Sequence, residues 1–89
     1  MQSMFYVYVL KSDKNSFYVG YTSNLGSRMF EHKNKMSKST GNEEFKLKYF
    51  EKFKDKNQAM AREKKLKGYP DRWLINLIIQ FNQEINLLE

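Results

Sequence analysis

Five polar side chains could carry chemistry in this 89-residue chain. Tyr8 and Tyr18 are ten residues apart, Arg28 follows ten residues later, and His32 lies four residues after Arg28. Tyrosine and histidine can pass protons, and arginine can bind a phosphate through two parallel hydrogen bonds. Further along, Glu63 offers a carboxylate that can hold a divalent cation. These residue types suit hydrolysis of a phosphate ester.

Several other kinds of site are excluded by composition. The chain has no cysteine, which excludes a disulfide framework, a cysteine zinc site and a thiol nucleophile. It has one histidine, so a histidine-rich metal site is excluded too. No Gly-Lys-Ser/Thr phosphate loop occurs. A Ser-His-Asp triad stays open, but no serine lies in a nucleophile-elbow context.

Chain length and charge further limit the classes of protein to which this chain could belong. The chain is long enough for one small domain, residues 1–89, and its 40% hydrophobic content can form a thin core. The net charge is +6, and residues 45–72 hold ten Lys or Arg against four Asp or Glu. A basic middle favours a polyanionic partner, most simply nucleic acid. The alternative is a lysine-rich solvated surface.

No membrane segment or signal peptide is expected. The N-terminus lacks a basic region followed by an apolar stretch. The most apolar segment, 73–81, is interrupted by Asn76 and Gln80 and is far shorter than the roughly 20 residues that span a bilayer. We therefore expect a cytoplasmic protein that does not contact membranes.

The first half of the chain predicts a hairpin and a helix. Residues 5–10 and 17–21 are rich in β-branched and aromatic residues and predict two antiparallel strands, the first buried on both faces. Gly20, inside the second strand, indicates close approach of another backbone or a ligand. Residues 22–24 offer helix caps, and 25–34 has helical spacing that places Arg28 and His32 on one face. Residues 34–44 are expected to form a loop.

The second half predicts a strand and two helices. Residues 47–53 mix aromatics with lysines and predict an edge strand. Asp55 or Asn57 can cap a helix that Gly68 ends near residue 67, and Pro70 can open a last helix. That helix has an apolar stripe widened by three further residues: Leu74, Ile78, Phe81, Ile85 and Leu88, with Ile75, Ile79 and Leu87. The fold class is therefore α/β, a small three-stranded antiparallel sheet flanked by helices, with an extra C-terminal apolar helix.

The motifs Tyr6-Val7-Tyr8 and Tyr18-Val19-Gly20, followed by Arg28 and His32, resemble the signature of the GIY-YIG endonuclease superfamily. Residues 61–67 resemble the later helix that carries the metal-binding glutamate of that family. The likeness covers about residues 4–75 and is greatest to small single-domain members similar to the UvrC N-terminal nuclease domain. In the first motif, tyrosine and valine replace the glycine and isoleucine of the family name.

The resemblance implies a metal-dependent DNA endonuclease that works in repair or recombination. Glu63 would hold one Mg²⁺ or Mn²⁺ ion, Arg28 would bind the scissile phosphate, and Tyr8 and Tyr18 would manage protons, with His32 assisting. Which tyrosine is the base stays open. Read singly, the tyrosines are ordinary strand aromatics, Arg28 and His32 are surface residues of a helix, and Glu63 is an ion-pair partner of Lys67. Their joint order and spacing favour the catalytic interpretation.

Several lysines are candidates for contact with the nucleic-acid backbone, with a solvated basic face as the alternative: Lys33, Lys35, Lys38 and Lys67. No base-reading recognition helix is evident, so we expect selectivity for DNA structure or strandedness, with RNA as a second candidate substrate. Tyr6 or Tyr49 could stack on unpaired bases. Glu43 and Glu44 lie where similar small members have a basic stretch.

Two other functions compete with the nuclease. One is a catalytically inactive nucleic-acid-binding module on a nuclease-like fold. The other is an adaptor that oligomerises through its last helix, because a homodimer could share that helix's wide apolar face. The simpler role of this helix is to pack across its own sheet.

Overall fold

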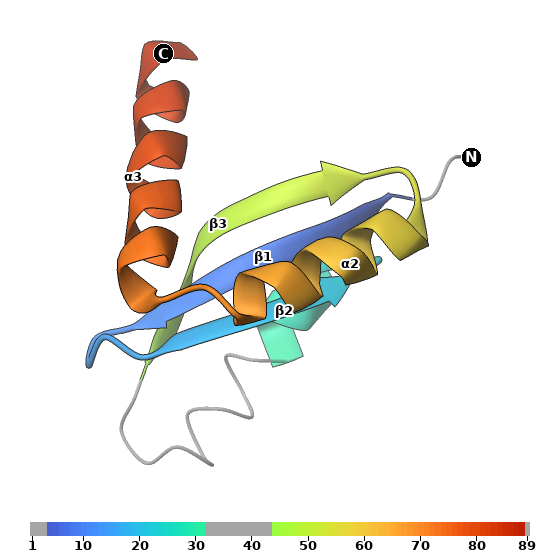
Figure 1. The fold of residues 1–89 in the computed structure, drawn as a ribbon, viewed down its shortest axis with the longest axis horizontal. Coiled ribbons are helices and arrows are strands. Elements are labelled where there is room, and N and C mark those ends of the chain that lie inside the picture. The colour runs from blue at the N-terminus through green and yellow to red at the C-terminus, as the bar shows by residue number, and fades with distance from the viewer. Residues whose placement is uncertain (1–3, 32–43, 89) are drawn as a thin grey trace.

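The computed structural model describes residues 4–31 and 44–88, and its centre is a three-stranded antiparallel sheet. The strands are β1 (Phe5–Ser12), β2 (Phe17–Thr22) and β3 (Phe45–Phe53), in the order β2-β1-β3 (Figure 1). A helical segment begins at residue 25 and continues to residue 31, where the described part ends. Helices α2 (Lys56–Lys67) and α3 (Asp71–Leu88) complete the fold. The predicted α/β class is confirmed, and β3 is an edge strand as expected.

The central strand β1 is buried on both faces. Val7, Tyr8, Val9 and Leu10 are each no more than 1% exposed. Successive side chains of a strand point to opposite faces, so Val7 and Val9 face one layer of the molecule while Tyr8 and Leu10 face the other. Because both faces are covered, β1 reads as a continuous apolar run in the sequence.

The connection from β1 to β2 is a tight polar turn, as predicted. The Ser12 hydroxyl accepts hydrogen bonds from the backbone N–H groups of Lys14 and Ser16, at 3.1 and 2.9 Å. Asn15 has a φ of 64°, a left-handed conformation that asparagine tolerates better than most residues. This turn fixes the register that places Tyr8 opposite Gly20.

Helix α2 covers the Val7 face of the sheet. Asp55 is its N-cap, because its carboxylate accepts from the backbone N–H of Asn57 at 2.9 Å. Gly68 ends the helix with a right-handed φ of −87°. Ala59 and Leu66 are fully buried and meet strand residues of β1 and β2 and the start of α3 in one apolar core: Val7, Val9, Val19, Ala59, Leu66, Leu74 and Ile78.

Helix α3 packs through its first turns and then extends away from the sheet (Figure 1). It begins one residue after Pro70, whose carbonyl accepts from the backbone N–H of Trp73. Leu74 and Ile78 are buried, and Phe81 packs edge-on against the Tyr49 ring at 5.3 Å. The rest of the predicted stripe, from Ile85 on, lies outside the described side chains. No helix in the described ranges is long and apolar enough to cross a membrane.

The other side of the predicted apolar face is open to solvent. Trp73, Ile75 and Ile79 are 47%, 40% and 49% exposed. Packing across the protein's own sheet, the simpler of the two expectations, therefore accounts for part of this helix only.

An ion pair joins α2 to β3. The Arg62 guanidinium donates to both carboxylate oxygens of Glu51, with Nε–Oε1 at 3.0 Å and Nη2–Oε2 at 2.9 Å. The Tyr49 hydroxyl donates to the same carboxylate, and the Arg62 guanidinium lies 6.0 Å from the centre of the Tyr69 ring. Hydrogen bonding to Glu51 raises the pKa of Arg62, and burial followed by the Glu51 hydrogen bond raises the pKa of Tyr49. The Glu51 carboxylate is therefore the shared acceptor of Arg62 and Tyr49.

Removing this ion pair should weaken the packing of α2 on the sheet and so lower the stability of the protein. We expect Arg62→Ala to lower the free energy of unfolding by about 1.5–3 kcal/mol, the range for hydrogen bonds to charged groups. Urea unfolding followed by circular dichroism measures it. Lys65→Ala, an exposed position on the same helix, should change stability by less than about 0.5 kcal/mol. Equal effects of the two substitutions would contradict a structural role for the pair.

Candidate active site

Tyr8 and Tyr18 form the centre of the candidate site. Both side chains lie on the same face of the sheet, from β1 and the edge strand β2, and their rings stack with centroids 6.2 Å apart. Tyr8 is buried, whereas Tyr18 is 38% exposed. One hydroxyl is thus held inside the protein, while the Tyr18 side chain reaches solvent.

Gly20 makes room for the Tyr8 ring. A Cβ atom at position 20 would lie 2.5 Å from the Tyr8 hydroxyl oxygen and 2.7 Å from Cζ. Real side chains do not approach this closely, so the Tyr8 hydroxyl can take its observed position only because residue 20 has no side chain. The sequence predicts close approach of another backbone or a ligand at this glycine, whereas in the structure the approaching group is the side chain of Tyr8.

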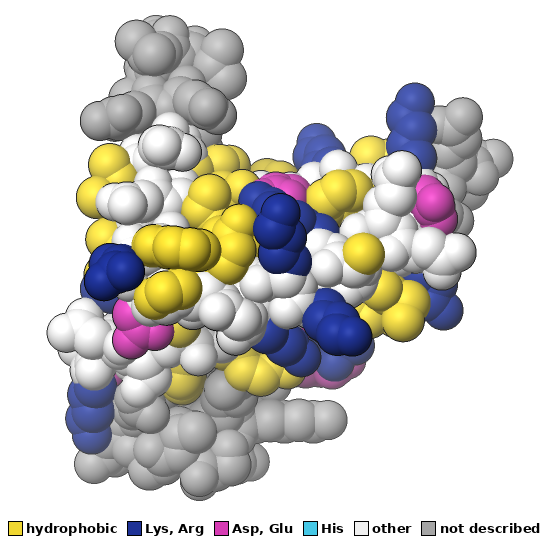
Figure 2. Space-filling view, viewed as in Figure 1, with side chains coloured by type: hydrophobic (Ala, Val, Ile, Leu, Met, Phe, Trp, Pro, Cys, Tyr) yellow, Lys and Arg dark blue, Asp and Glu magenta, His cyan; other side chains and the backbone are white. Residues whose placement is uncertain are grey.

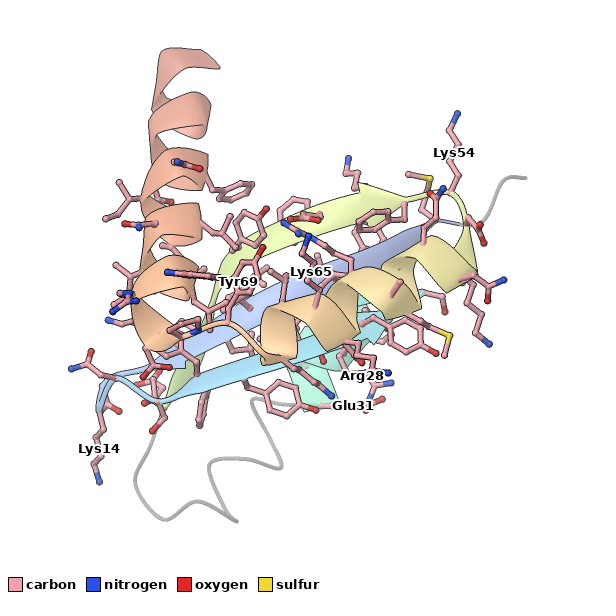
Figure 3. The ribbon with its side chains drawn as sticks, viewed as in Figure 1. Lys14, Arg28, Glu31, Lys54, Lys65 and Tyr69 are labelled. Carbon is pink, nitrogen blue, oxygen red and sulfur yellow. The ribbon has the colours of Figure 1, made fainter. Side chains whose placement is uncertain are left out.

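Arg28 is supplied by the helical segment 25–31. Asn24 caps this segment, because its side chain accepts from the backbone N–H of Ser27 at 3.1 Å, and Arg28 then follows in the first turn. Its guanidinium lies 3.6 Å from the Glu31 carboxylate, and both side chains are about half exposed, at 44% and 48%. Figure 3 shows the two together beneath α2 and β2.

Arg28 also borders a small hollow where the chain leaves β2. The hollow has a volume of about 280 Å³ and is lined by Phe5, Tyr21, Thr22, Ser23, Arg28 and Lys56. Lys56, the first residue of α2, was not among the predicted site residues. Only the packing of α2 beside β2 brings Lys56 near Arg28, and no spacing in the sequence indicates it.

Glu63 projects from α2 and is mostly buried. Its side chain is 20% exposed, and a carboxylate oxygen lies 3.6 Å from the Lys67 ammonium, which is 56% exposed. The structure therefore contains the Glu63–Lys67 ion pair that the sequence offers as a non-catalytic role for Glu63. At this distance and exposure such a pair contributes at most about 0.5 kcal/mol, so it does not prevent Glu63 from binding a cation.

The pKa of Tyr8 is influenced by three other candidate residues, Tyr18, Arg28 and Glu63. Burial raises the pKa of the Tyr8 phenol, and the nearby Tyr18 and Glu63 raise it further, while Arg28 lowers it. A hydrogen bond with the Tyr18 side chain adds to the rise. Arg28 and Glu63, 35 residues apart in the chain, thus both lie close enough to act on the same hydroxyl. At neutral pH that hydroxyl keeps its proton.

The oxygen donors fit a lightly coordinated hard cation. In the part of the chain that the structure describes, no three His, Cys, Asp or Glu side chains form a metal-binding group. Glu63 therefore belongs to no such group of three among the described residues, and we consider its one carboxylate as the donor. That suits Mg²⁺ or Mn²⁺, which can be held by one carboxylate while water and substrate oxygens fill the other positions.

Other predicted residues lie outside the described residues: His32, Lys33, Lys35 and Lys38. Of the acidic stretch, Glu44 is described, and its backbone N–H donates to the Asp13 carboxylate at 3.3 Å. Lys and Arg side chains are spread over the face seen in Figure 2, while hydrophobic side chains gather at the base of α3. The basic character is thus distributed over that face.

The two glycines near the site should respond in opposite ways to alanine. Gly20→Ala should destabilise the protein by about 1–3 kcal/mol, the usual cost of overpacking, because the buried Tyr8 ring must move. Gly26→Ala is the matched control, since its Cβ would meet only Asn24 Oδ1 at 3.8 Å. It should be neutral or stabilising by up to about 1 kcal/mol in a helix. Urea unfolding of both variants checks this, and a harmless Gly20→Ala would show that Tyr8 is loosely held.

Comparison with known proteins identifies the family of this chain. The GIY-YIG catalytic domain family matches residues 4–76. A UPF0213 protein of Clostridium perfringens is 36% identical over 94% of this chain and 100% of its own length. A UPF0213 protein of Oceanobacillus iheyensis is also 36% identical, over 94% of this chain and 99% of its own. No solved structure matches. With its hairpin of two tyrosine motifs, its helix-borne arginine and its later glutamate, the chain belongs to the GIY-YIG family of nuclease domains.

Proposed function

We propose that this protein is a divalent-metal-dependent endonuclease that hydrolyses DNA phosphodiester bonds. One observation carries the proposal: the rings of Tyr8 and the partly exposed Tyr18 stack on one face of the sheet. The charges of Arg28 and Glu63, from separate elements, both influence the pKa of the Tyr8 phenol. Family membership supports it independently. A phosphate bound beside the exposed Tyr18 phenol would lie near the Arg28 guanidinium and the Glu63 carboxylate, with the Tyr8 phenol buried behind Tyr18.

Arg28 is assigned to the scissile phosphate. Its guanidinium is half exposed and has only the weak Glu31 contact at 3.6 Å among the ion pairs of the described residues, so a phosphate can replace that contact. Two parallel N–H···O bonds would orient the phosphate and stabilise the charge that develops on it. Lys56 on the same hollow adds positive charge.

Glu63 is assigned to hold one Mg²⁺ or Mn²⁺ ion. A divalent cation bound there supplies positive charge to the phosphoryl and leaving oxygens. Lys67 lies beside this carboxylate, and we assign it, with Lys33, Lys35 and Lys38, to neighbouring phosphates of the substrate.

The two tyrosines are assigned different roles. Tyr8 is buried and its pKa is raised, so it stays protonated and holds the Tyr18 hydroxyl by hydrogen bonding. Tyr18 reaches solvent, so we assign its hydroxyl to the attacking water and to the transfer of that water's proton. His32 follows the last described residue of the Arg28 helix and keeps its predicted assisting role.

The finer parts of the proposal concern substrate and setting. We propose selectivity for DNA structure or strandedness, a role in repair or recombination, and a cytoplasmic location. The absence of cysteine suits a reducing compartment. A domain that binds nucleic acid without cutting it is the alternative that the following experiment separates.

Cleavage of labelled single-stranded, duplex and flapped DNA with Mg²⁺ or Mn²⁺ tests the proposal. Glu63→Gln and Arg28→Ala should each lower the rate by about 10²–10³-fold, the usual loss when a group that stabilises transition-state charge is removed. EDTA should abolish cleavage in the wild type. The cleavage rate of an RNA of the same sequence tests RNA as the competing substrate.

Two substitutions on α3 provide matched controls. Asp71→Asn and Arg72→Ala remove the same kinds of charge at exposed positions on another helix, and both variants should cut at the wild-type rate. Salt-sensitive binding without cleavage by the wild type would favour the inactive binding module. Equal cleavage by all variants would contradict the assigned residues.

We also propose that the exposed side of α3 mediates a homodimer. The half-exposed Trp73, Ile75 and Ile79 support this, because burying them would remove apolar surface from water. Sedimentation velocity should show an average mass that rises with concentration, and Ile79→Lys should return the protein to monomer. Asn82→Lys, an exposed polar position on the same helix, is the control. A wild type that is monomeric at every concentration would contradict the dimer.

A further inference from the structure

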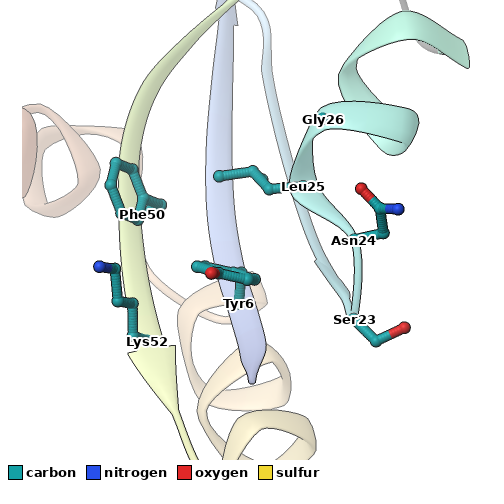
Figure 4. Close-up of a pocket in the computed structure, with 7 residues that line it drawn as sticks. All are labelled: Tyr6, Ser23, Asn24, Leu25, Gly26, Phe50 and Lys52. Atoms are coloured by element: carbon teal, nitrogen blue, oxygen red, sulfur yellow. The ribbon is translucent and has the colours of Figure 1, made fainter. Parts of the chain in front are cut away.

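A second hollow opens on the face of the sheet opposite α2. It has a volume of about 370 Å³ and is lined by Tyr6, Ser23, Asn24, Leu25, Gly26, Phe50 and Lys52. Figure 4 shows Tyr6, Phe50 and Lys52 on β1 and β3, facing Leu25 at the start of the Arg28 helix. Its volume is at the lower end of the range for small-molecule sites. None of the assigned catalytic residues lines it.

We call this second hollow the aromatic groove, because the rings of Tyr6 and Phe50 form its floor. Tyr6 and Phe50 meet edge to face with centroids 6.2 Å apart. The Phe50 ring is held in turn by Phe81 of α3, at 5.3 Å. Both Tyr6 and Phe50 remain partly exposed. Rings that contact one another and are still partly exposed suit the stacking of a flat ligand, because little side-chain freedom is lost on binding.

The structure distinguishes the two aromatics that were predicted to stack on bases. Tyr49 contacts Phe81 and donates its hydroxyl to Glu51, so it belongs to the joint between β3 and the helices. Tyr6 lines the open groove. Tyr6 also occupies the position where the family's first motif has glycine, so this chain places an aromatic ring where that motif has no side chain.

The charges around the groove suit an anionic ligand. Lys52 is the register partner of Tyr6 across β1 and β3 and is exposed on the rim. Ser23 lines both this groove and the hollow that contains Arg28 and Lys56. Among the described residues that line either hollow, three are cationic and none is a carboxylate. A phosphate chain that passes from one hollow to the other would therefore meet cationic lining residues, and at Arg28 it would replace the Glu31 carboxylate.

The groove also lies close to the candidate active site. Tyr6 precedes Tyr8 by two residues on the same face of β1, and Leu25 precedes Arg28 by three residues in the same helical segment. A nucleotide in the groove would thus be a near neighbour of a phosphate bound at Arg28.

We infer that the aromatic groove binds an unpaired nucleotide of single-stranded DNA, with its base stacked on Tyr6 and its phosphate toward Lys52. The inference rests on the proposed function, since it places this nucleotide next to the scissile phosphate. A base in an intact duplex is stacked and paired and cannot occupy the groove. The site therefore gives a physical basis for a preference for single-stranded or flapped DNA.

Binding measured without cleavage tests the groove. Fluorescence anisotropy in EDTA would compare a labelled oligothymidine with a fully paired hairpin. Tyr6→Leu keeps an apolar side chain but loses the ring, and should weaken single-strand binding about 5- to 150-fold, as expected for one lost base stack. Hairpin binding should change less than twofold. Tyr6→Phe should retain single-strand binding.

Lys52→Ala tests the phosphate contact. It should lower the slope of log K against log salt by about 0.7 for single strands, the value for one lost phosphate contact. Lys14→Ala, in the turn between β1 and β2 (Figure 3), is the matched control and should leave the slope unchanged.

Each outcome bears on a separate proposal. Unchanged single-strand affinity of Tyr6→Leu would overturn the groove even if the wild type cuts DNA. Equal losses for single strand and hairpin would also overturn it, because they indicate general damage. Tyr6-dependent binding by a wild type that does not cut would support the groove and contradict the nuclease. Tighter, Tyr6-dependent binding of an RNA of equal length would overturn the assignment to DNA.

Discussion

The double burial of β1 is the constraint on which the rest of the structure depends. One face of this strand supplies Val7 and Val9 to the core beneath α2, and the other supplies Tyr8 to the candidate active site. Because consecutive residues serve opposite layers, a shift of one residue in register would place tyrosines in the core and valines in the site. Folding and assembly of the site are thus the same event in this small protein.

Much of the fold could be predicted from local patterns. The strand composition of β1 and β2, the cap at Asp55 and the stop at Gly68 are signals of sequence neighbours, and the structure follows them within a residue or two. Within the site, Gly20 indicated a close approach. That Tyr8 is the group approaching it depends on cross-strand register, which composition alone does not fix.

Other features depend on packing between distant segments and had no local signal. Glu51 pairs with Arg62 only because α2 packs on the sheet beside β3. Lys56 lines the same hollow as Arg28 for a similar reason. The two similar-looking aromatics Tyr6 and Tyr49 also could not be separated in advance, because their roles depend on which face of the sheet each side chain takes and on where α3 packs.

The adjacency of Arg62 and Glu63 on α2 has a mechanical consequence. Neighbouring residues of a helix point about 100° apart around its axis, so the two-pronged bond from Arg62 to Glu51 fixes the angle at which α2 is rotated. That angle decides where the Glu63 carboxylate points. Strand β3 carries none of the assigned catalytic side chains, yet through Glu51 it determines the direction in which Glu63, the proposed metal ligand, points. Stability and activity should therefore change together at this joint, and sequence drift at Glu51 would be restrained by both.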